Sequence, residues 1–318
     1  MKRLLGLLVL IVILNGCDDG KLTVDTINFE DVTASSCGEI IYKLKDSEAL
    51  FMKIPAEKDA FLNDETLLDK PREIPIGGEV TVRYRFYNGK VVSDNICIVS
   101  GPITPVATGE WIAKSGTIQI TTKAVFATTN TETGQKKISG YNHSIVYKNI
   151  VFSKSDGTEQ KYDTFTFGDY QTPATSLPFS FDIKLVEQCP TTTKIFNARN
   201  NGNESLVIEN VDSNLIQNNT GTVTQPITAT SNKLVYRLYG SSLPTTALQL
   251  GYFCGNTVPD LPAIKEEWIA TSGDIEVITT TSGGYLHTIR LKNVTFKKSN
   301  SSFYYGDDIP FGELLLPE

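Results

Sequence analysis

An internal duplication constrains the fold of this chain more than any other feature of its sequence. The segment EWIAKSGTI at residues 110–118 returns as EWIATSGDI at residues 267–275, with seven of nine positions identical. Both tryptophans occupy equivalent positions in the two copies, and both histidines end a Gly-Tyr-x-His motif, at residues 140–143 and 284–287. Two homologous domains in tandem are therefore expected. Their shared signature residues are Trp111, Gly116, His143, Trp268, Gly273 and His287.

Apolar residues alternate with polar ones along short runs. Val80, Val82 and Tyr84 alternate with Thr81 and Arg83, which is the period of a strand with one buried face. We predict an all-β protein of two tandem β-sandwich (Ig-like) repeats, with tandem small β-barrels as the alternative. Expected strands of the first copy lie near residues 39–45, 50–54, 79–87, 96–100, 117–126, 143–152, 164–167 and 179–186, with one short helical candidate at 57–68.

The alternation of apolar and polar residues also indicates the environment of the histidines and tryptophans. His143 shares a strand face with Ile145 and Tyr147, and the apolar parity flips after Lys148-Asn149. The flip predicts a β-bulge at this Lys-Asn pair and at its counterpart, residues 292–293. We interpret both histidines and both tryptophans as packing residues; a catalytic histidine and a tryptophan that stacks on carbohydrate are the alternatives.

Four cysteines fall into two equivalent pairs. Cys37 and Cys97 are 60 positions apart in the first copy, and Cys189 and Cys254 are 65 positions apart in the second. An oxidising compartment would allow one disulfide in each repeat, worth about 4 kcal/mol in the chain-entropy description. A four-cysteine metal site would need closely spaced ligand pairs such as C-x-x-C, and the sequence has none.

The first residues combine a positively charged start with an apolar run. Lys2 and Arg3 precede an apolar run at residues 4–14 that is too short to span a bilayer comfortably. The run closes with Leu14-Asn15-Gly16-Cys17, which resembles the lipobox where signal peptidase cuts before the cysteine and a diacylglycerol is joined to its thiol. The resemblance implies lipidation of Cys17 with palmitate-type chains and a membrane anchor. An ordinary signal peptide with an incidental cysteine is the alternative.

The residues after Cys17 bear on location. Asp18-Asp19-Gly20-Lys21 resembles the acidic surface-export tags of Bacteroidota lipoproteins, which implies the outer membrane or the cell surface. A solvated tether without a targeting role is one alternative. In enteric bacteria an acidic residue here would favour the inner membrane. We expect a signal peptide at 1–16, a tether at 17–22, β-sandwich repeat 1 at 23–186 and β-sandwich repeat 2 at 187–318.

Composition and motifs argue against several functions. The net charge of −7 and the lack of a basic patch argue against a nucleic-acid partner. The sequence contains no G-x-S-x-G, no H-E-x-x-H and no phosphate-binding loop, so we predict a non-enzymatic protein without a cofactor or a metal. Gly168-Asp169 and residues 306–308 are interpreted as turn residues, with a calcium site as the alternative.

The expected function is binding or assembly with an envelope protein or a glycan. A surface hydrolase that degrades glycans, with carboxylates converging from distant strands, is the alternative. The largest difference between the copies is a polar excursion at residues 128–137, because Ile120 to His143 spans 23 positions and Val277 to His287 only 10. Such a hairpin tip is a candidate contact loop, although it could persist without a role. Its candidate residues are Thr129, Asn130, Glu132, Gln135 and Lys136.

Overall fold

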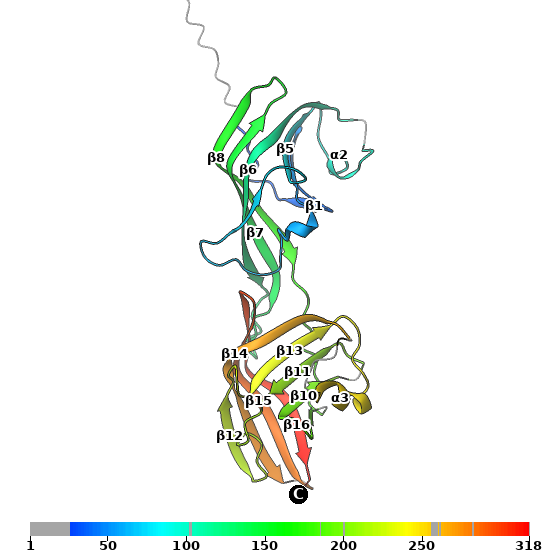
Figure 1. Cartoon of the computed structure of the whole chain (residues 1–318), viewed down its shortest axis with the longest axis vertical. Coiled ribbons are helices and arrows are strands. Elements are labelled where there is room, and N and C mark those ends of the chain that lie inside the picture. Colours follow the sequence, from blue (N-terminus) through cyan, green and yellow to red (C-terminus); the bar gives the residue numbers. More distant parts are fainter. Residues whose placement is uncertain are drawn as a thin grey trace, which may run out of the picture.

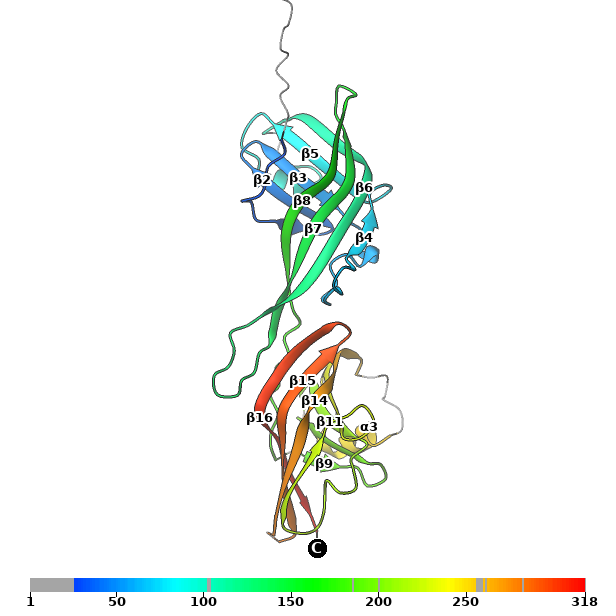
Figure 2. The ribbon, with the colours of Figure 1, turned by 90° about the vertical axis from the view of Figure 1, so that its left-hand side faces the viewer.

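The computed structural model describes residues 26–101, 104–184, 186–199, 201–255, 260, 262–281 and 283–317. Within these residues the protein is all-β, as predicted, with two antiparallel sheets of eight strands, one in each repeat. The repeats lie one beyond the other along the long axis of the molecule (Figure 1 and, from the side, Figure 2). The predicted signal peptide, lipobox and tether lie outside the described residues.

Equivalent strands follow one another in the two repeats. Repeat 1 contains β1 (Ser35–Cys37), β2 (Ile40–Lys45), β3 (Glu48–Lys53), β4 (Arg72–Pro75), β5 (Thr81–Tyr87), β6 (Ala107–Phe126), β7 (Ile138–Ser153) and β8 (Glu159–Pro173). Repeat 2 contains β9 (Val186–Gln188), β10 (Lys194–Ala198), β11 (Glu204–Glu209), β12 (Gly221–Pro226), β13 (Lys233–Tyr239), β14 (Ile264–Thr281), β15 (Tyr285–Lys298) and β16 (Ser301–Leu316). The helical segments are η1 (Ala56–Lys58), α2 (Asp94–Cys97) and α3 (Thr246–Phe253).

Each sheet curls because one long strand, β6 or β14, pairs with one neighbour along its first half and with another along its second half. The first half of β6 pairs with β5, where Arg83 lies opposite Ile112. Its second half pairs with β4, where Ile74 lies opposite Ile118, and β7 follows both halves. In repeat 2, β14 pairs with β13 and β12 in the same way. Each repeat is thus one curled antiparallel sheet, an arrangement that fits both the predicted β-sandwich and the alternative small barrel.

The bend of the long strands lies at the predicted bulge. Gly116 in β6 and Asn149 in β7 have φ angles of +130° and +50°, and the β6–β7 register shifts on both sides of Ser115, the residue before Gly116. A Cβ atom on Gly116 would lie 2.9 Å from Cα of Ile150, so no larger residue fits where β6 approaches β7 at the bend. Repeat 2 has the same arrangement at Gly273 and Asn293, with φ angles of +121° and +52°. The bulge predicted from the Lys-Asn pairs is confirmed.

Each repeat has an inner core and a smaller outer cluster. The inner cores lie within the curl of the sheets and include Leu50, Ile118 and Tyr147 in repeat 1, all with 0 % exposure. The outer clusters lie on the other face, beneath α2 and α3 respectively. Their buried members are Tyr42, Ala49, Phe51, Tyr87 and Val91 in repeat 1, and Cys189, Phe196, Ala198, Val207, Tyr239, Leu243, Tyr252 and Phe253 in repeat 2.

A lead-in segment packs onto each core before the first strand. Ile27 and Phe29 are buried in the first core, and Phe179 and Phe181 pack against the second. Phe29 and Phe181 each precede the first cysteine of their repeat by eight positions. The second core therefore takes side chains from residues before 187, the expected start of repeat 2. Of the strand expected at 179–186, only Val186 belongs to β9.

Two other expected elements differ from the structure. The strand expected at 96–100 is wrong: this segment begins in α2, because β5 pairs directly with β6 and leaves no neighbouring strand for it. The helical candidate at 57–68 is also wrong beyond the single turn of η1, which ends where Asp59 adopts a left-handed conformation with φ of +49°. The remainder of that segment reaches towards repeat 2.

Candidate functional site

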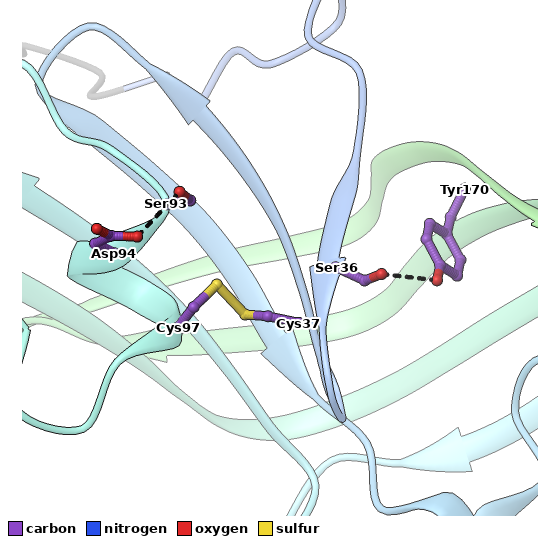
Figure 3. The surroundings of a disulfide bond; sticks show 6 residues. All are labelled: Ser36, Cys37, Ser93, Asp94, Cys97 and Tyr170. Carbon is purple, nitrogen blue, oxygen red and sulfur yellow. Dashed lines mark hydrogen bonds between the residues drawn. A yellow bond between two sulfur atoms is a disulfide. The ribbon is translucent and has the colours of Figure 1, made fainter.

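Both predicted disulfides are present. Cys37 is bonded to Cys97, with 5.8 Å between their Cα atoms, and Cys189 is bonded to Cys254, with 5.3 Å. Each bond joins the first strand region of its repeat to the helix that covers the outer cluster, as Figure 3 shows for repeat 1. The lipidation candidate, Cys17, lies outside the described residues.

The signature histidines occupy equivalent places in the two cores, and both are 0 % exposed. Nδ1 of His143 lies 2.8 Å from Oγ1 of Thr122, and Nε2 lies 2.9 Å from Oγ1 of Thr172. Nδ1 of His287 lies 2.8 Å from Oγ1 of Thr279, whereas its buried Nε2 has no hydrogen-bond partner. Burial lowers the pKa of both rings, that of His143 to about 4, with the charge of Arg72 acting in the same direction. Both rings are therefore neutral at pH 7.

The signature tryptophans close the inner cores at their other end. Trp111 and Trp268 are 5 % and 4 % exposed, and each lies beneath a lysine ammonium, Lys154 at 4.2 Å and Lys298 at 5.7 Å from the ring. Such an environment leaves no exposed ring face for a sugar to stack on. Nε1 of Trp268 is buried without a hydrogen-bond partner.

The predicted contact loop lies against repeat 2. The Lys136 N–H donates to the Tyr304 carbonyl at 2.9 Å, and the Asp307 N–H donates to the Thr133 carbonyl at 2.8 Å. Lys136 and Tyr304 thereby form an antiparallel β-bridge, so the loop extends the free edge of β16. Gly134 lies so close to the Asp307 carboxylate that a Cβ atom would be 2.8 Å from Oδ2. The base of the loop, which comprises residues 133–136, is therefore a contact between the two repeats.

The tip of the loop is held by its own hydrogen bonds. Oδ1 of Asn130 accepts the N–H groups of Glu132 and Thr133 at 2.9 and 3.2 Å, and the Asn130 N–H donates to the Gln135 carbonyl at 2.9 Å. Thr129, Asn130 and Glu132 are exposed, whereas Gln135 is half-buried. The tip thus presents polar side chains to solvent from a fixed base.

A second segment of repeat 1, between β3 and β4, makes a separate contact with repeat 2. Oδ1 of Asp64 accepts the N–H groups of Asn300 and Ser301 at 3.0 and 3.1 Å, and the Ser301 hydroxyl at 3.1 Å. The Glu65 N–H donates to Oγ of Ser301 at 3.0 Å. Arg72 supports the segment from behind by donating to the Asp64 carbonyl at 2.7 Å and to Oγ1 of Thr122 at 2.6 Å. No motif in the sequence marks Asp64 for this role.

The chain between β8 and β9, which links the repeats, is held by side chains of both repeats. Nζ of Lys137 donates to the carbonyls of Leu177 and Pro178 at 3.2 and 3.4 Å. From repeat 2, the buried Glu204 carboxylate accepts the N–H groups of Phe179 and Ser180 at 2.9 and 2.6 Å. Burial lowers the pKa of Lys137, and the charge of Glu204 opposes this shift. A lysine of repeat 1 and a glutamate of repeat 2 thus hold one short stretch of chain.

The structure contains a hollow at the junction, where the two repeats meet, and another within repeat 1. One, of about 460 Å³, lies at the junction and is lined by Ala127, Lys137, Ile138, Leu177 and Phe303 among others. The other, of about 630 Å³, lies in repeat 1 between the lead-in segment and β8, with Glu30, Asp31, Lys43 and Asp169 among its lining residues. The second hollow is lined by carboxylates from two distant parts of repeat 1, Glu30 and Asp31 in the lead-in segment and Asp169 in β8, and the hydrolase alternative requires such convergence.

Lys43, beside the second hollow, is 3 % exposed. Its ammonium donates to the Phe29 carbonyl at 3.1 Å, and a Cβ atom on Gly168 would lie 2.7 Å from Nζ. Burial lowers the pKa of Lys43, and the charge of Asp169 opposes this shift. Asn197 occupies the same place in repeat 2, where its amide donates to the Asp182 carbonyl at 3.0 Å. Because both side chains hold a lead-in segment, we interpret Lys43 as structural.

The Gly-Asp motifs lie in strands, so their interpretation as turn residues is wrong. Asp169 in β8 accepts the Ser144 hydroxyl at 2.5 Å. Asp308 in β16 pairs with Arg290 at 2.6 Å and with Lys292 at 2.9 Å. The motifs are also not equivalent, since Gly168 lies opposite Ile145 and its counterpart, opposite Ile289, is Gly312 rather than Gly306. Among the described residues, no three His, Cys, Asp or Glu side chains gather as a metal site would require.

No family model, curated protein or solved structure matches the chain. None of the helices in the described part of the chain is long and apolar enough to cross a membrane.

Proposed function

We propose that this protein is a lipid-anchored component of the bacterial cell envelope that serves as a binding or assembly module and not as an enzyme. The junction carries this proposal. Two segments of repeat 1, residues 54–71 and 127–137, bind β16 and the turn before it, so the two repeats form one extended arm. The C-terminal residues lie at the end of repeat 2 that faces away from repeat 1 (Figures 1 and 2). An arm anchored at its N-terminus would hold repeat 2 away from the membrane.

The exposed tip of residues 127–137 is the proposed contact for an envelope protein or a glycan. Its base is ordered by repeat 2, which reduces the entropy that a partner would have to remove on binding. Thr129 and Glu132 are the side chains to test, because Asn130 also supports the loop itself. The double variant Thr129→Ala, Glu132→Ala should keep its thermal unfolding and lose captured envelope partners or glycan binding. Undiminished binding would move the contact to another surface.

Lipidation is tested on Cys17. Because the apolar run at residues 4–14 is too short to anchor the chain comfortably, Cys17→Ser should abolish palmitate labelling and either release the protein from membranes or leave the precursor uncleaved. Detergent-phase partitioning measures the release. Unchanged labelling and partitioning in Cys17→Ser would refute the anchor, and protease treatment of intact cells would show whether the anchored arm is on the surface.

A further inference from the structure

Four large aliphatic side chains of repeat 1 are exposed around α2. Their exposed fractions are 46 % for Val92, 49 % for Ile98, 106 % for Val99 and 49 % for Val106, and we call these four residues the α2 apolar patch. Single exposed aliphatic residues are ordinary on a protein surface, but several in one short segment are typical of an interaction site.

Repeat 2 shows that the fold does not require this exposure. The corresponding segment after β13 contains α3, and it buries Leu243, Tyr252 and Phe253 to 3 %, 8 % and 6 % exposure. These side chains pack in the outer cluster with Phe196 and Tyr239. The segment after β5 instead turns the four residues of its patch outward. The exposed aliphatic side chains of the repeat 2 segment, Leu250 and Ile264, reach 37 % and 38 % exposure, so the exposure is greater in repeat 1.

The α2 apolar patch is held on fixed supports. Cys97, directly before Ile98, is bonded to Cys37 of β1 (Figure 3). The two ends of the segment are tied to each other where the Asn88 N–H donates to the Val106 carbonyl at 3.0 Å. The disulfide and this bond therefore restrain the backbone of the segment that carries the patch.

The N-terminal end of the described chain lies beside the support of this patch. The end of β2 and the turn that follows it contact the two: Nζ of Lys45 donates to the Asn28 carbonyl at 3.1 Å, and the Asp46 carbonyl accepts the Val91 N–H at 2.8 Å. The chain from Cys17 to Thr26 can extend by at most about 30 Å. A lipid on Cys17 would therefore keep this end of repeat 1 close to the bilayer.

We propose that the α2 apolar patch inserts into the interfacial region of a lipid bilayer and fixes the orientation of repeat 1 on it. This inference rests on the proposed lipid anchor. Apolar side chains gain free energy at the boundary of headgroups and acyl chains. A tether raises the effective concentration of the patch at the surface, so a contact too weak to act alone becomes populated. The net charge of −7 offers no attraction to anionic headgroups, so the contact depends on the apolar side chains.

The test uses tryptophan as a depth probe. The mature chain, with an N-terminal histidine tag in place of Cys17, is bound to phosphatidylcholine vesicles that contain nickel-chelating lipid and brominated acyl chains. Val99→Trp places a new indole in the patch. Leu68→Trp is the matched control, because Leu68 is 87 % exposed beside the 52 % exposed Leu67, but lies in the segment between β3 and β4 that contacts repeat 2, away from the N-terminal end. The native Trp111 and Trp268 are common to both variants.

The proposal predicts that the added emission of Val99→Trp shifts to shorter wavelength and is mostly quenched on the brominated vesicles, whereas that of Leu68→Trp is unchanged. Unquenched Val99→Trp on vesicles that have bound the protein would overturn the proposal. So would a concentration-dependent shift without vesicles, because it would assign the patch to self-association. The tag replaces the lipid, so quenching supports the patch even if Cys17 proves unlabelled, and labelled Cys17 without quenching overturns the patch alone.

Discussion

Asp64→Ala is expected to uncouple the two repeats. One carboxylate oxygen accepts three donors from the turn between β15 and β16, at 3.0, 3.1 and 3.1 Å. A hydrogen bond to a charged group contributes about 1.5–3 kcal/mol when well shielded. Asp64 is half-buried and its three donors share one oxygen, so water offsets much of this sum. We expect a loss of about 2 kcal/mol from the free energy that couples the repeats.

Calorimetry measures this coupling. If the junction makes the repeats unfold together, the full chain should show one transition, and Asp64→Ala should separate it into two or broaden it. Asp156→Ala is the control, because Asp156 lies in the equivalent turn of repeat 1 and there bonds only within the turn, to the N–H and hydroxyl of Thr158 at 2.9 and 2.7 Å. This variant should leave the separation of the transitions unchanged.

A double-mutant cycle with Ser301→Ala decides whether the effect belongs to the junction. Because Ser301→Ala removes the hydroxyl that donates to Oδ1 of Asp64, the two substitutions should be non-additive by about 1 kcal/mol. Additive effects, or an Asp64→Ala variant that lowers the stability of repeat 1 while the transitions remain coupled, would refute the reasoning.

The remaining predictions concern the loop, the buried histidine and the glycine at the bend. Replacing residues 129–135 by a tight turn should lower the coupling of the repeats in calorimetry, since the hydrogen bond between Thr133 and Asp307 is lost; unchanged coupling would contradict the docking. The pKa of His143 is about 4 in the folded state and ordinarily 6.5, so the histidine binds a proton more readily in the unfolded chain. The free energy of unfolding should therefore fall by roughly 3 kcal/mol as the pH drops from 6.5 to 4. In urea titrations across this window His143→Gln should flatten that fall, and an equally steep fall in the variant would exclude His143 as its source. Gly273→Ala, whose Cβ would lie 2.8 Å from the Lys292 carbonyl oxygen, should lose about 2–4 kcal/mol of stability. Gly157→Ala, with φ of +84° and no atom within 4 Å, should lose only about 1 kcal/mol, and equal losses in the two would exclude the steric explanation.

Equal spacing in the sequence concealed differences in the fold. Arg85 and Arg237 both follow the first cysteine of their repeat by 48 positions, and each lies opposite the glutamate before the signature tryptophan. Between these points the repeats differ, because the hairpin from β10 to β11 is longer than that from β2 to β3, while the segment between β3 and β4 is longer than its counterpart. These changes compensate, so spacing alone could not show that residues 54–71 reach repeat 2.

The sequence by itself determined what depends on local pattern and on repetition. Alternation of apolar residues specified the long strands and the buried faces of the histidines, the parity change at the Lys-Asn pairs specified the bend, and the duplicated cysteines specified the disulfides. Each of these features is repeated in the chain, so two independent stretches supported every inference.

Only the tertiary structure decided how the two repeats meet. The Asp64 carboxylate bonds to residues more than 230 positions away, and Lys136 bridges to a strand edge that the sequence does not reveal as free. These contacts occur once in the chain and join residues with no shared pattern, because a hydrogen bond between surfaces depends on the orientation of the folded repeats. The polar excursion that looked like a free tip in the sequence is therefore a docked loop in the folded protein.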